Sequence, residues 1–392
     1  MLLVTACRVA PRPAAVATAP GRAASPRLAG DTARVSLLDR DGLRDRVGEE
    51  LARALDGWAA ELDGISPELA PVTEAVRAFV LDGGKRLRPA FGWWGWRGAG
   101  GEPDGRRADT VVRAVAALEL VHACALVHDD VMDASATRRG APSVHERFDA
   151  LHRELGYVGS ASGFGRSAAI LIGDLLLVWA DRLFTGCGLP ATELARARLP
   201  YDGMRTEVMA GQFLDVLAQA SREVDIERAL RVARYKSATY TVQRPLHVGA
   251  RLAGAPADLV ACYTAYGIPV GEAFQLRDDL LGVFGDPGVT GKPAGDDLRE
   301  GKRTVLVALT RRNGSAAGRH ELDRLLGDPE LGLDGVDALR QIIEGSGARA
   351  EVEQMITVRL QAGLAVLAAG PVDPAATDVL AALATTAAVR AA

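Results

Sequence analysis

Residues 115–133 read VAALELVHACALVHDDVMD, an apolar stretch that ends in three carboxylates. Positions three and four residues apart in it would share one stripe of a helix, namely Val115, Leu118, His122, Ala125 and Asp129. On the same helix Asp133 lies one turn beyond Asp129, whereas Asp130 points about 100° away. This pattern predicts a helix that carries carboxylates to the mouth of an apolar interior, where they can bind a hard cation such as Mg²⁺.

A second apolar stretch ends in Asp278 and Asp279, 149 positions after Asp129 (278 minus 129). One Asp-Asp-x-x-Asp string is weak evidence, because about one chain in ten carries it by chance, and it is as readily a solvated helix end. Two clusters at the ends of buried-looking helices are harder to explain that way, since a buried carboxylate is costly unless it is paired with a cation. The pair predicts a metal-bridged site for a diphosphate with an apolar tail.

Basic residues beside glycines form the counterpart of these clusters. The segment Gly83-Gly84-Lys85-Arg86-Leu87-Arg88-Pro89 combines backbone amides that can approach an anion with cations suited to phosphate. Arg138-Arg139-Gly140 follows the first aspartate cluster, and further cations occur at Lys236, Lys292 and Lys302. A single lysine is ordinarily a solvated surface charge. The placement of these residues next to glycines and aspartates favours diphosphate binding instead.

From about residue 37 onward, apolar positions three and four apart alternate with short Gly/Pro/Asp breaks, which predicts an all-α fold. We expect one helical domain over 36–392, with a pair of helical subdomains as the alternative, and a disordered tail over 1–35. The clearest long loop spans 285–295, directly after the second cluster. The predicted helices are 37–62, 69–81, 108–131, 167–187, 191–219, 256–283, 335–345 and 349–369.

Composition excludes several classes of protein. A formal charge of -4 and a pI near 6.0 do not suggest a nucleic-acid surface. Four widely spaced cysteines indicate reduced core thiols in a cytoplasmic protein. The stretch 168–184, which we take as the most apolar, is interrupted by Asp174, Asp181 and Arg182, so no membrane span is expected.

At this point the chain resembles a known family, the trans-type polyprenyl diphosphate synthases, and most closely the bacterial geranylgeranyl diphosphate synthases. The resemblance runs from about residue 40 to 370, and the motifs occur in the family's order. They are residues 83–89, Asp129 to Asp133 with Arg138-Arg139, Gly211 to Asp215, Lys236-Ser237, Phe274-Gln275 with Asp278-Asp279, and Gly291-Lys292 with Lys302.

The resemblance implies a helical bundle of the type I isoprenoid synthase kind around a central apolar cavity. It implies that Mg²⁺ is bound by Asp129, Asp130, Asp133, Asp278 and Asp279. The allylic diphosphate (dimethylallyl, geranyl or farnesyl) would meet Arg138, Lys236, Ser237, Gln275, Lys292 and Lys302. Isopentenyl diphosphate would meet Lys85, Arg88, His122 and Arg139. A homodimer is also implied, and Asp129, Asp130, Asp133, Arg138, Lys236 and Asp278 would carry catalysis.

The sequence departs from the family's pattern at two positions, and a few small residues are candidates for setting the chain length of the product. Gly282 stands where the family usually has a third aspartate, and Ser237 replaces the more frequent threonine. Cys124 and Ala125, with Val121 one turn deeper, are small enough to let a growing tail pass, which favours a C20 product. Alternatively, Cys124 and Ala125 are small only to let helices pack closely, and Trp93 or Trp94 forms the floor of the tunnel.

Three other functions compete with a C20 synthase. They are a class I terpene cyclase, a longer-chain synthase and a non-catalytic modulating subunit. A cyclase would need a second metal motif of the Asn/Ser/Glu type, and a non-catalytic subunit should have lost site residues.

Overall fold

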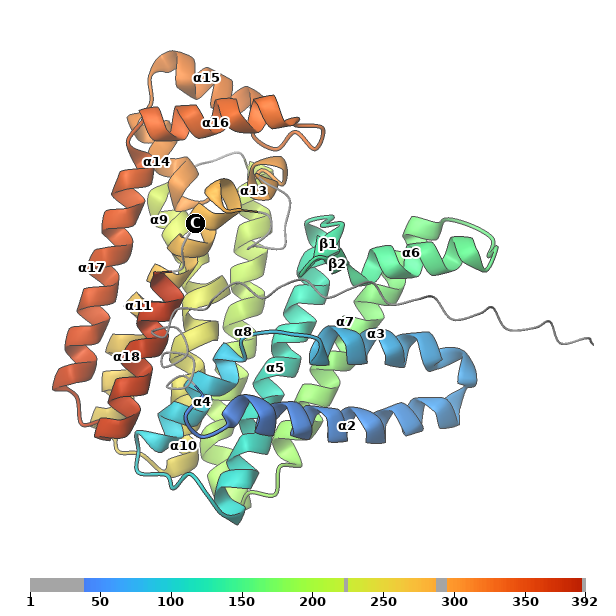
Figure 1. The fold of residues 1–392 in the computed structure, drawn as a ribbon, viewed down its shortest axis with the longest axis vertical. Coiled ribbons are helices and arrows are strands. Elements are labelled where there is room, and N and C mark those ends of the chain that lie inside the picture. The colour runs from blue at the N-terminus through green and yellow to red at the C-terminus, as the bar shows by residue number, and fades with distance from the viewer. Residues whose placement is uncertain (1–38, 222–224, 287–294, 390–392) are drawn as a thin grey trace, which may run out of the picture.

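The computed structural model describes residues 39–221, 225–286 and 295–389, and these residues are almost entirely helical, which confirms the all-α prediction (Figure 1). The predicted tail 1–35 lies outside the described residues, as does most of the predicted loop 285–295. The elements are α2 (Leu43–Ile65), η1 (Pro67–Leu69), α3 (Ala70–Leu81), α4 (Leu87–Arg97), α5 (Arg106–Met132), β1 (Thr137–Arg138), β2 (Ala141–Pro142), α6 (Val144–Glu154), α7 (Ala161–Thr185), α8 (Ala191–Ser221), α9 (Ile226–Val232), η2 (Ala233–Gln243), α10 (Arg244–Ala253), α11 (Ala257–Phe284), α13 (Asp296–Arg299), α14 (Val305–Asn313), α15 (Ala316–Leu325), α16 (Leu333–Gly345), α17 (Ala348–Ala369) and α18 (Pro374–Ala388).

Most of the helices predicted from periodicity are present to within a few residues. The prediction 37–62 was wrong at its start, because Gly42 takes a left-handed φ of 59° and α2 begins only at Leu43. Several helices were not predicted, including α4 and the run from α9 to α10. Residues 88–96 of α4 are all buried, so that helix has no polar face to give a period.

Helix α5 forms the centre of the bundle, packed between α7 and α4, while α2 and α3 lie across one side (Figure 1). From Val111 to Cys124 nearly every α5 residue is buried. By length and composition α5 could cross a membrane, with a mean hydropathy of 1.8 in its most apolar window. Among the described residues no other helix meets this criterion, so α5 rather than the stretch 168–184 is the apolar segment to consider. Because 72% of its most apolar window is buried in the fold, core packing accounts for its hydrophobicity.

The aromatic run at 91–96 belongs to this core. Trp93 and Trp94 are fully buried, and the Trp93 indole nitrogen donates to Asp41 Oδ2 at 2.8 Å. Trp93 also packs on Trp96, with 4.9 Å between ring centroids. These contacts tie α4 to the segment before α2, so packing explains the run.

The segment η2 is a π-helix of 11 residues held between α8 and α11. A Cβ on Gly211 of α8 would lie 2.3 Å from the backbone nitrogen of Lys236, and one on Gly271 of α11 would lie 2.5 Å from Ala238 Cα. Only glycine therefore allows the three backbones to approach so closely. The π geometry matters for function, because such segments occur frequently at functional sites and this one carries Lys236 and Ser237.

Candidate active site

The first acidic wall, Asp129, Asp130 and Asp133, stands at the carboxyl end of α5. Asp129 accepts hydrogen bonds from Lys236 Nζ at 3.0 Å and from Gln212 Nε2 at 2.9 Å. Burial of Asp129 favours its neutral form, but Lys236, Lys302 and Arg138 outweigh this and hold its pKa below the ordinary value. Asp130 is fully buried and accepts from Arg138 Nε at 2.8 Å. Asp129 is therefore kept charged, ready to bind a cation.

A tight hairpin sends two adjacent arginines to different places. Thr137 pairs with Pro142 and Arg138 with Ala141, so Arg139 and Gly140 form a two-residue turn in which both have positive φ, 56° and 78°. Arg138 points to the first acidic wall, whereas Arg139 Nη1 donates to the Phe79 carbonyl at 3.2 Å. The motif Arg138-Arg139-Gly140 thus directs one cation to the first acidic wall and the other to the neighbourhood of Phe79 on α3.

Lys236 links η2 to both the first wall and α8. Its Nζ lies 3.0 Å from Asp129 Oδ1 and 2.7 Å from Asp215 Oδ2. Burial opposes a charged lysine, but the carboxylates of Asp129 and Asp215 raise its pKa above the ordinary value. Lys236 is therefore a permanent cation beside the first acidic wall. Ser237, next in η2, is buried.

The second acidic wall, Asp278 and Asp279, lies near the end of α11. Gln275 Nε2 donates to Asp279 Oδ1 at 2.7 Å, so the residue predicted to contact substrate also orients an aspartate. Burial raises the pKa of Asp279 to about 8, despite the Gln275 hydrogen bond, and the neighbouring Asp297 and Asp278 carboxylates act in the same direction. A bound divalent cation would reverse this shift, because it stabilises the charged form.

Lys302 pairs with the first acidic wall and with the segment around α13. Its Nζ lies 3.4 Å from Asp133 Oδ2, 3.2 Å from Asp297 Oδ1 and 2.6 Å from Glu300 Oε2. Although burial disfavours its charge, these carboxylates raise the pKa of Lys302 well above the ordinary value. Asp133 is held nearby with its pKa raised to about 6 by burial and by the Asp129 carboxylate. Lys292, the other lysine predicted here, lies outside the described residues.

The residues present fit a hard divalent cation. Asp133 Oδ2 is buried and has no hydrogen-bond partner among the described residues; its ion-pair contact is Lys302 Nζ at 3.4 Å. Within 39–221, 225–286 and 295–389, no three His, Cys, Asp or Glu side chains come close enough to cage a metal. Mg²⁺ needs no such cage, because one or two carboxylates, waters and substrate phosphates complete its shell.

A separate cationic cluster consists of Arg88 of α4, His122 of α5 and Arg139 of the hairpin. Lys85, which was predicted to belong with them, lies in the turn just before α4. Arg88 is almost buried: its Nη2 donates to Thr241 Oγ1 at 2.9 Å, and its guanidinium lies 4.2 Å above the Tyr240 ring. His122 Nδ1 is 3.1 Å from the Tyr240 hydroxyl. Burial, followed by the charges of Arg88 and Arg139, lowers the pKa of His122 well below its ordinary value. His122 is therefore a neutral hydrogen-bonding group among cations.

Behind this cluster lies a buried ion pair that sequence reasoning missed. Arg86 Nη1 donates to Glu119 Oε1 at 2.8 Å, and Arg86 Nη2 donates to the Val80 carbonyl at 2.7 Å. Arg86 takes a left-handed φ of 50°, which is uncommon for a residue with a side chain. The pair therefore fixes the turn from which Lys85 and Arg88 project. In the sequence, the only indication of this ion pair is Glu119 within an otherwise apolar stretch.

The three residues predicted to set product length lie on α5 above the first wall. Val121 and Cys124 are buried and Ala125 is partly buried. Cys124 Sγ lies 3.8 Å from His128 Nδ1, and His128 Nε2 is 3.1 Å from the Ile170 carbonyl of α7. Cys124 thus lies on the α7-facing side of α5, while Ala125 shares a stripe with Asp129.

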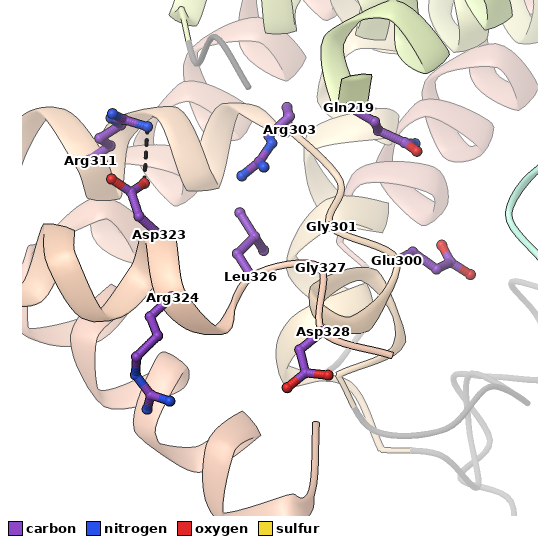
Figure 2. A pocket seen from close by; sticks show the side chains of 10 residues that line it. All are labelled: Gln219, Glu300, Gly301, Arg303, Arg311, Asp323, Arg324, Leu326, Gly327 and Asp328. Atoms are coloured by element: carbon purple, nitrogen blue, oxygen red, sulfur yellow. Dashed lines mark hydrogen bonds and ion pairs between the residues drawn. The ribbon is translucent and has the colours of Figure 1, made fainter. Parts of the chain in front are cut away.

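A polar pocket of about 570 Å³ lies beside Glu300, Gly301 and Arg303, the residues that flank Lys302 in the sequence (Figure 2). Gln219, Glu300, Arg303 and the pair Arg311 and Asp323, joined at 3.0 Å, line it. Its walls are charged, so it does not supply the apolar space that a prenyl tail needs.

Comparisons with known proteins agree with this geometry. Residues 70–343 match the family model of the polyprenyl synthetases. The geranylfarnesyl diphosphate synthase of Aeropyrum pernix is 32% identical over 297 residues, which cover 75% of this chain and 85% of that protein. The geranylgeranyl diphosphate synthase of Mycobacterium tuberculosis is 36% identical over 256 residues, covering 64% and 67%. A geranylgeranyl pyrophosphate synthase structure from Corynebacterium glutamicum, complexed with isoprenyl diphosphate and magnesium, has 41% identity and a TM-score of 0.86, covering 90% of this chain and 99% of that one.

Proposed function

Since this chain belongs to the polyprenyl synthetase family, we propose that it is a Mg²⁺-dependent prenyltransferase. It condenses isopentenyl diphosphate head-to-tail with dimethylallyl, geranyl or farnesyl diphosphate and releases a short all-trans polyprenyl diphosphate, chiefly geranylgeranyl diphosphate (C20). One observation carries the proposal. Lys236, Arg138 and Lys302 pair with the first acidic wall on α5, and Lys302 also acts on Asp279 of the second wall on α11, while a separate group of cations surrounds Arg88 of α4.

The residues divide the reaction between them. The allylic C–O bond breaks, a C–C bond forms to the isopentenyl double bond, and a proton leaves. Mg²⁺, when bound, neutralises charge on the departing diphosphate. Arg138, Lys236 and Lys302 supply fixed positive charge at the same end. The apolar α5 interior excludes water from the cation. No side chain is needed as base, because the released diphosphate can accept the proton.

The alternatives fit the site less well. A class I terpene cyclase has no use for a second diphosphate cluster such as Lys85, Arg88 and Arg139. A modulating subunit should have lost acidic or basic site residues, and this sequence keeps nearly all of them. A longer-chain synthase differs only in tail space, so product analysis must decide. The relatives named above are geranylfarnesyl (C25) and geranylgeranyl (C20) diphosphate synthases, and Cys124 and Ala125 favour C20 here.

The exposed faces of α7 and α8 support a homodimer. Ile170, Leu171 and Val178 are 48%, 67% and 61% exposed on α7, and Phe213 is 68% exposed on α8. Exposed apolar side chains along a helix commonly mark an interface, and light scattering of the Leu171→Lys variant tests it. Cys124, Cys187 and Cys262 are free and buried, which fits the proposed cytoplasmic location.

The decisive experiment is an assay of the purified protein. Isopentenyl diphosphate is supplied with each allylic primer, and product length is read by mass spectrometry. Asp129→Asn should lower turnover by orders of magnitude without unfolding the protein, and excess chelator should abolish turnover. The matched control is Asp109→Asn, an exposed aspartate at the other end of α5. Full activity in excess chelator would contradict the proposal.

A further inference from the structure

Position 282 on α11 is one turn beyond the second acidic wall. It follows Asp278 by four residues and Asp279 by three, so a side chain there would face the same site. The residue is glycine, and the space is already filled. A Cβ built on Gly282 would lie 1.8 Å from Asp297 Oδ2 and 2.4 Å from Asp297 Cγ. The carboxylate of Asp297 therefore occupies the position from which a residue at 282 would project.

Asp297 is held there by contacts on both sides. It is 9% exposed on the short helix α13, which follows Gly295 at a left-handed φ of 70°. Lys302 Nζ donates to Asp297 Oδ1 at 3.2 Å, and the Lys302 backbone nitrogen donates to the Asp297 carbonyl at 3.0 Å. The same Nζ reaches Asp133 Oδ2 of the first acidic wall at 3.4 Å. Asp297 thus lies between Gly282 of α11 and the Lys302 ammonium, which also contacts the first acidic wall.

We propose that Asp297 is the third carboxylate of the second acidic wall, supplied by α13 through space in place of a side chain at position 282. Carboxylate oxygens are the ligands that Mg²⁺ prefers, either directly or through its waters. Gly282 is then required for a steric reason, because any Cβ at 282 would displace Asp297. This inference rests on the proposed function, since it assigns Asp297 to the same diphosphate-bound cation.

A purely structural role for Asp297 makes a different prediction. If Asp297 only neutralises Lys302, then Asp297→Asn frees a buried cation, so pyrophosphate should bind more tightly without Mg²⁺ and the Mg²⁺ requirement should not change. If Asp297 serves the cation, the Mg²⁺ concentration needed should rise. Residues that support a metal ligand typically contribute a factor of about 10–100 in affinity.

The test measures thermal stabilisation of the full chain by inorganic pyrophosphate as Mg²⁺ is titrated. Asp297→Asn should raise the half-saturating Mg²⁺ concentration at least about tenfold. Asp296→Asn, the adjacent aspartate on α13, removes the same charge and should leave the titration unchanged. An Asp297→Asn titration that matches the parent overturns the inference. If the parent itself shows no Mg²⁺-dependent stabilisation, the proposed function fails instead.

Moving the carboxylate from position 297 to position 282 distinguishes a loss of the carboxylate from a general loss of structure. Gly282→Ala alone should raise the Mg²⁺ requirement, because its Cβ displaces Asp297 and supplies no carboxylate. Gly282→Asp combined with Asp297→Ala should recover most of the parent's affinity, since a carboxylate again faces the site. Circular dichroism without ligands confirms that each variant is folded. A folded double variant that binds Mg²⁺ no better than Asp297→Ala would overturn the inference.

Discussion

Arg88 gives the sharpest test of the two-site assignment. Its guanidinium is fixed by the Thr241 hydroxyl at 2.9 Å and by the Tyr240 ring at 4.2 Å, and its Nε is buried without a hydrogen-bond partner among the described residues. It can therefore donate to a diphosphate without reorganising. A charge-assisted hydrogen bond contributes about 1.5–3 kcal/mol. At about 1.36 kcal/mol per tenfold, Arg88→Ala should raise the KM for isopentenyl diphosphate about 10- to 150-fold.

Steady-state kinetics with each substrate varied in turn check this expectation. The KM for the allylic diphosphate should change little, because that substrate meets Arg138, Lys236 and Lys302 instead. Arg88→Lys keeps the charge but loses the planar fork, so it should fall between parent and alanine. Arg46→Ala is the matched control, since Arg46 also stacks on an aromatic ring, Trp93 at 4.9 Å, away from the site. Equal increases in both KM values would refute the assignment.

Two further predictions concern product length and acid stability. Cys124→Phe should fill the space beside α5 and shift the product toward C15 while the first condensation continues; an active variant that keeps the parent's chain length shows that Cys124 does not line the tunnel. Burial and the nearby Arg244 and Arg251 lower the pKa of His247 to about 4, so between pH 6.5 and 4 the unfolded chain binds more protons and stability falls as pH falls. His247 should lower the free energy of unfolding by about 2 kcal/mol between pH 8 and 5. The variant His247→Gln can keep the hydrogen bond to Thr264. In denaturant unfolding its free energy should therefore fall by about 2 kcal/mol less than the parent's over this pH range.

Sequence reasoning succeeded where one face of a helix is polar. Helices such as α8, α11 and α17 show apolar positions three and four apart, and their bounds were predicted to within a few residues. It failed for α4, which is buried all round, and for the hairpin, whose strands have only two residues each. The π-helical geometry of η2 has no local signal either. It results from glycines on α8 and α11 that are 60 positions apart (271 minus 211).

The same division holds for the site. Charged residues beside glycines could be found in the sequence, because that combination is typical of anion binding. The residues that hold these charged groups in position could not be found in the sequence. Tyr240 and Glu119 act on partners 118 and 33 positions away, and Asp297 faces a glycine of another helix, so only the fold brings them together. Lys292 and the roles of the chain-length residues stay predictions.

The geometry also explains why two diphosphates of like charge need not compete for one site. The hairpin turn at Arg139 and Gly140 sends Arg138 toward Asp130 and Arg139 toward α3 and α4. Carboxylates surround the Arg138 side, so a diphosphate there requires a divalent cation as a bridge. Beside Arg139 the carboxylate is Glu119, already paired with Arg86. A diphosphate can bind on that side by cations alone. Under the proposed function, the substrate that must ionise would bind where Mg²⁺ can stabilise the leaving group, and the substrate that must keep its diphosphate would bind where no metal promotes its loss.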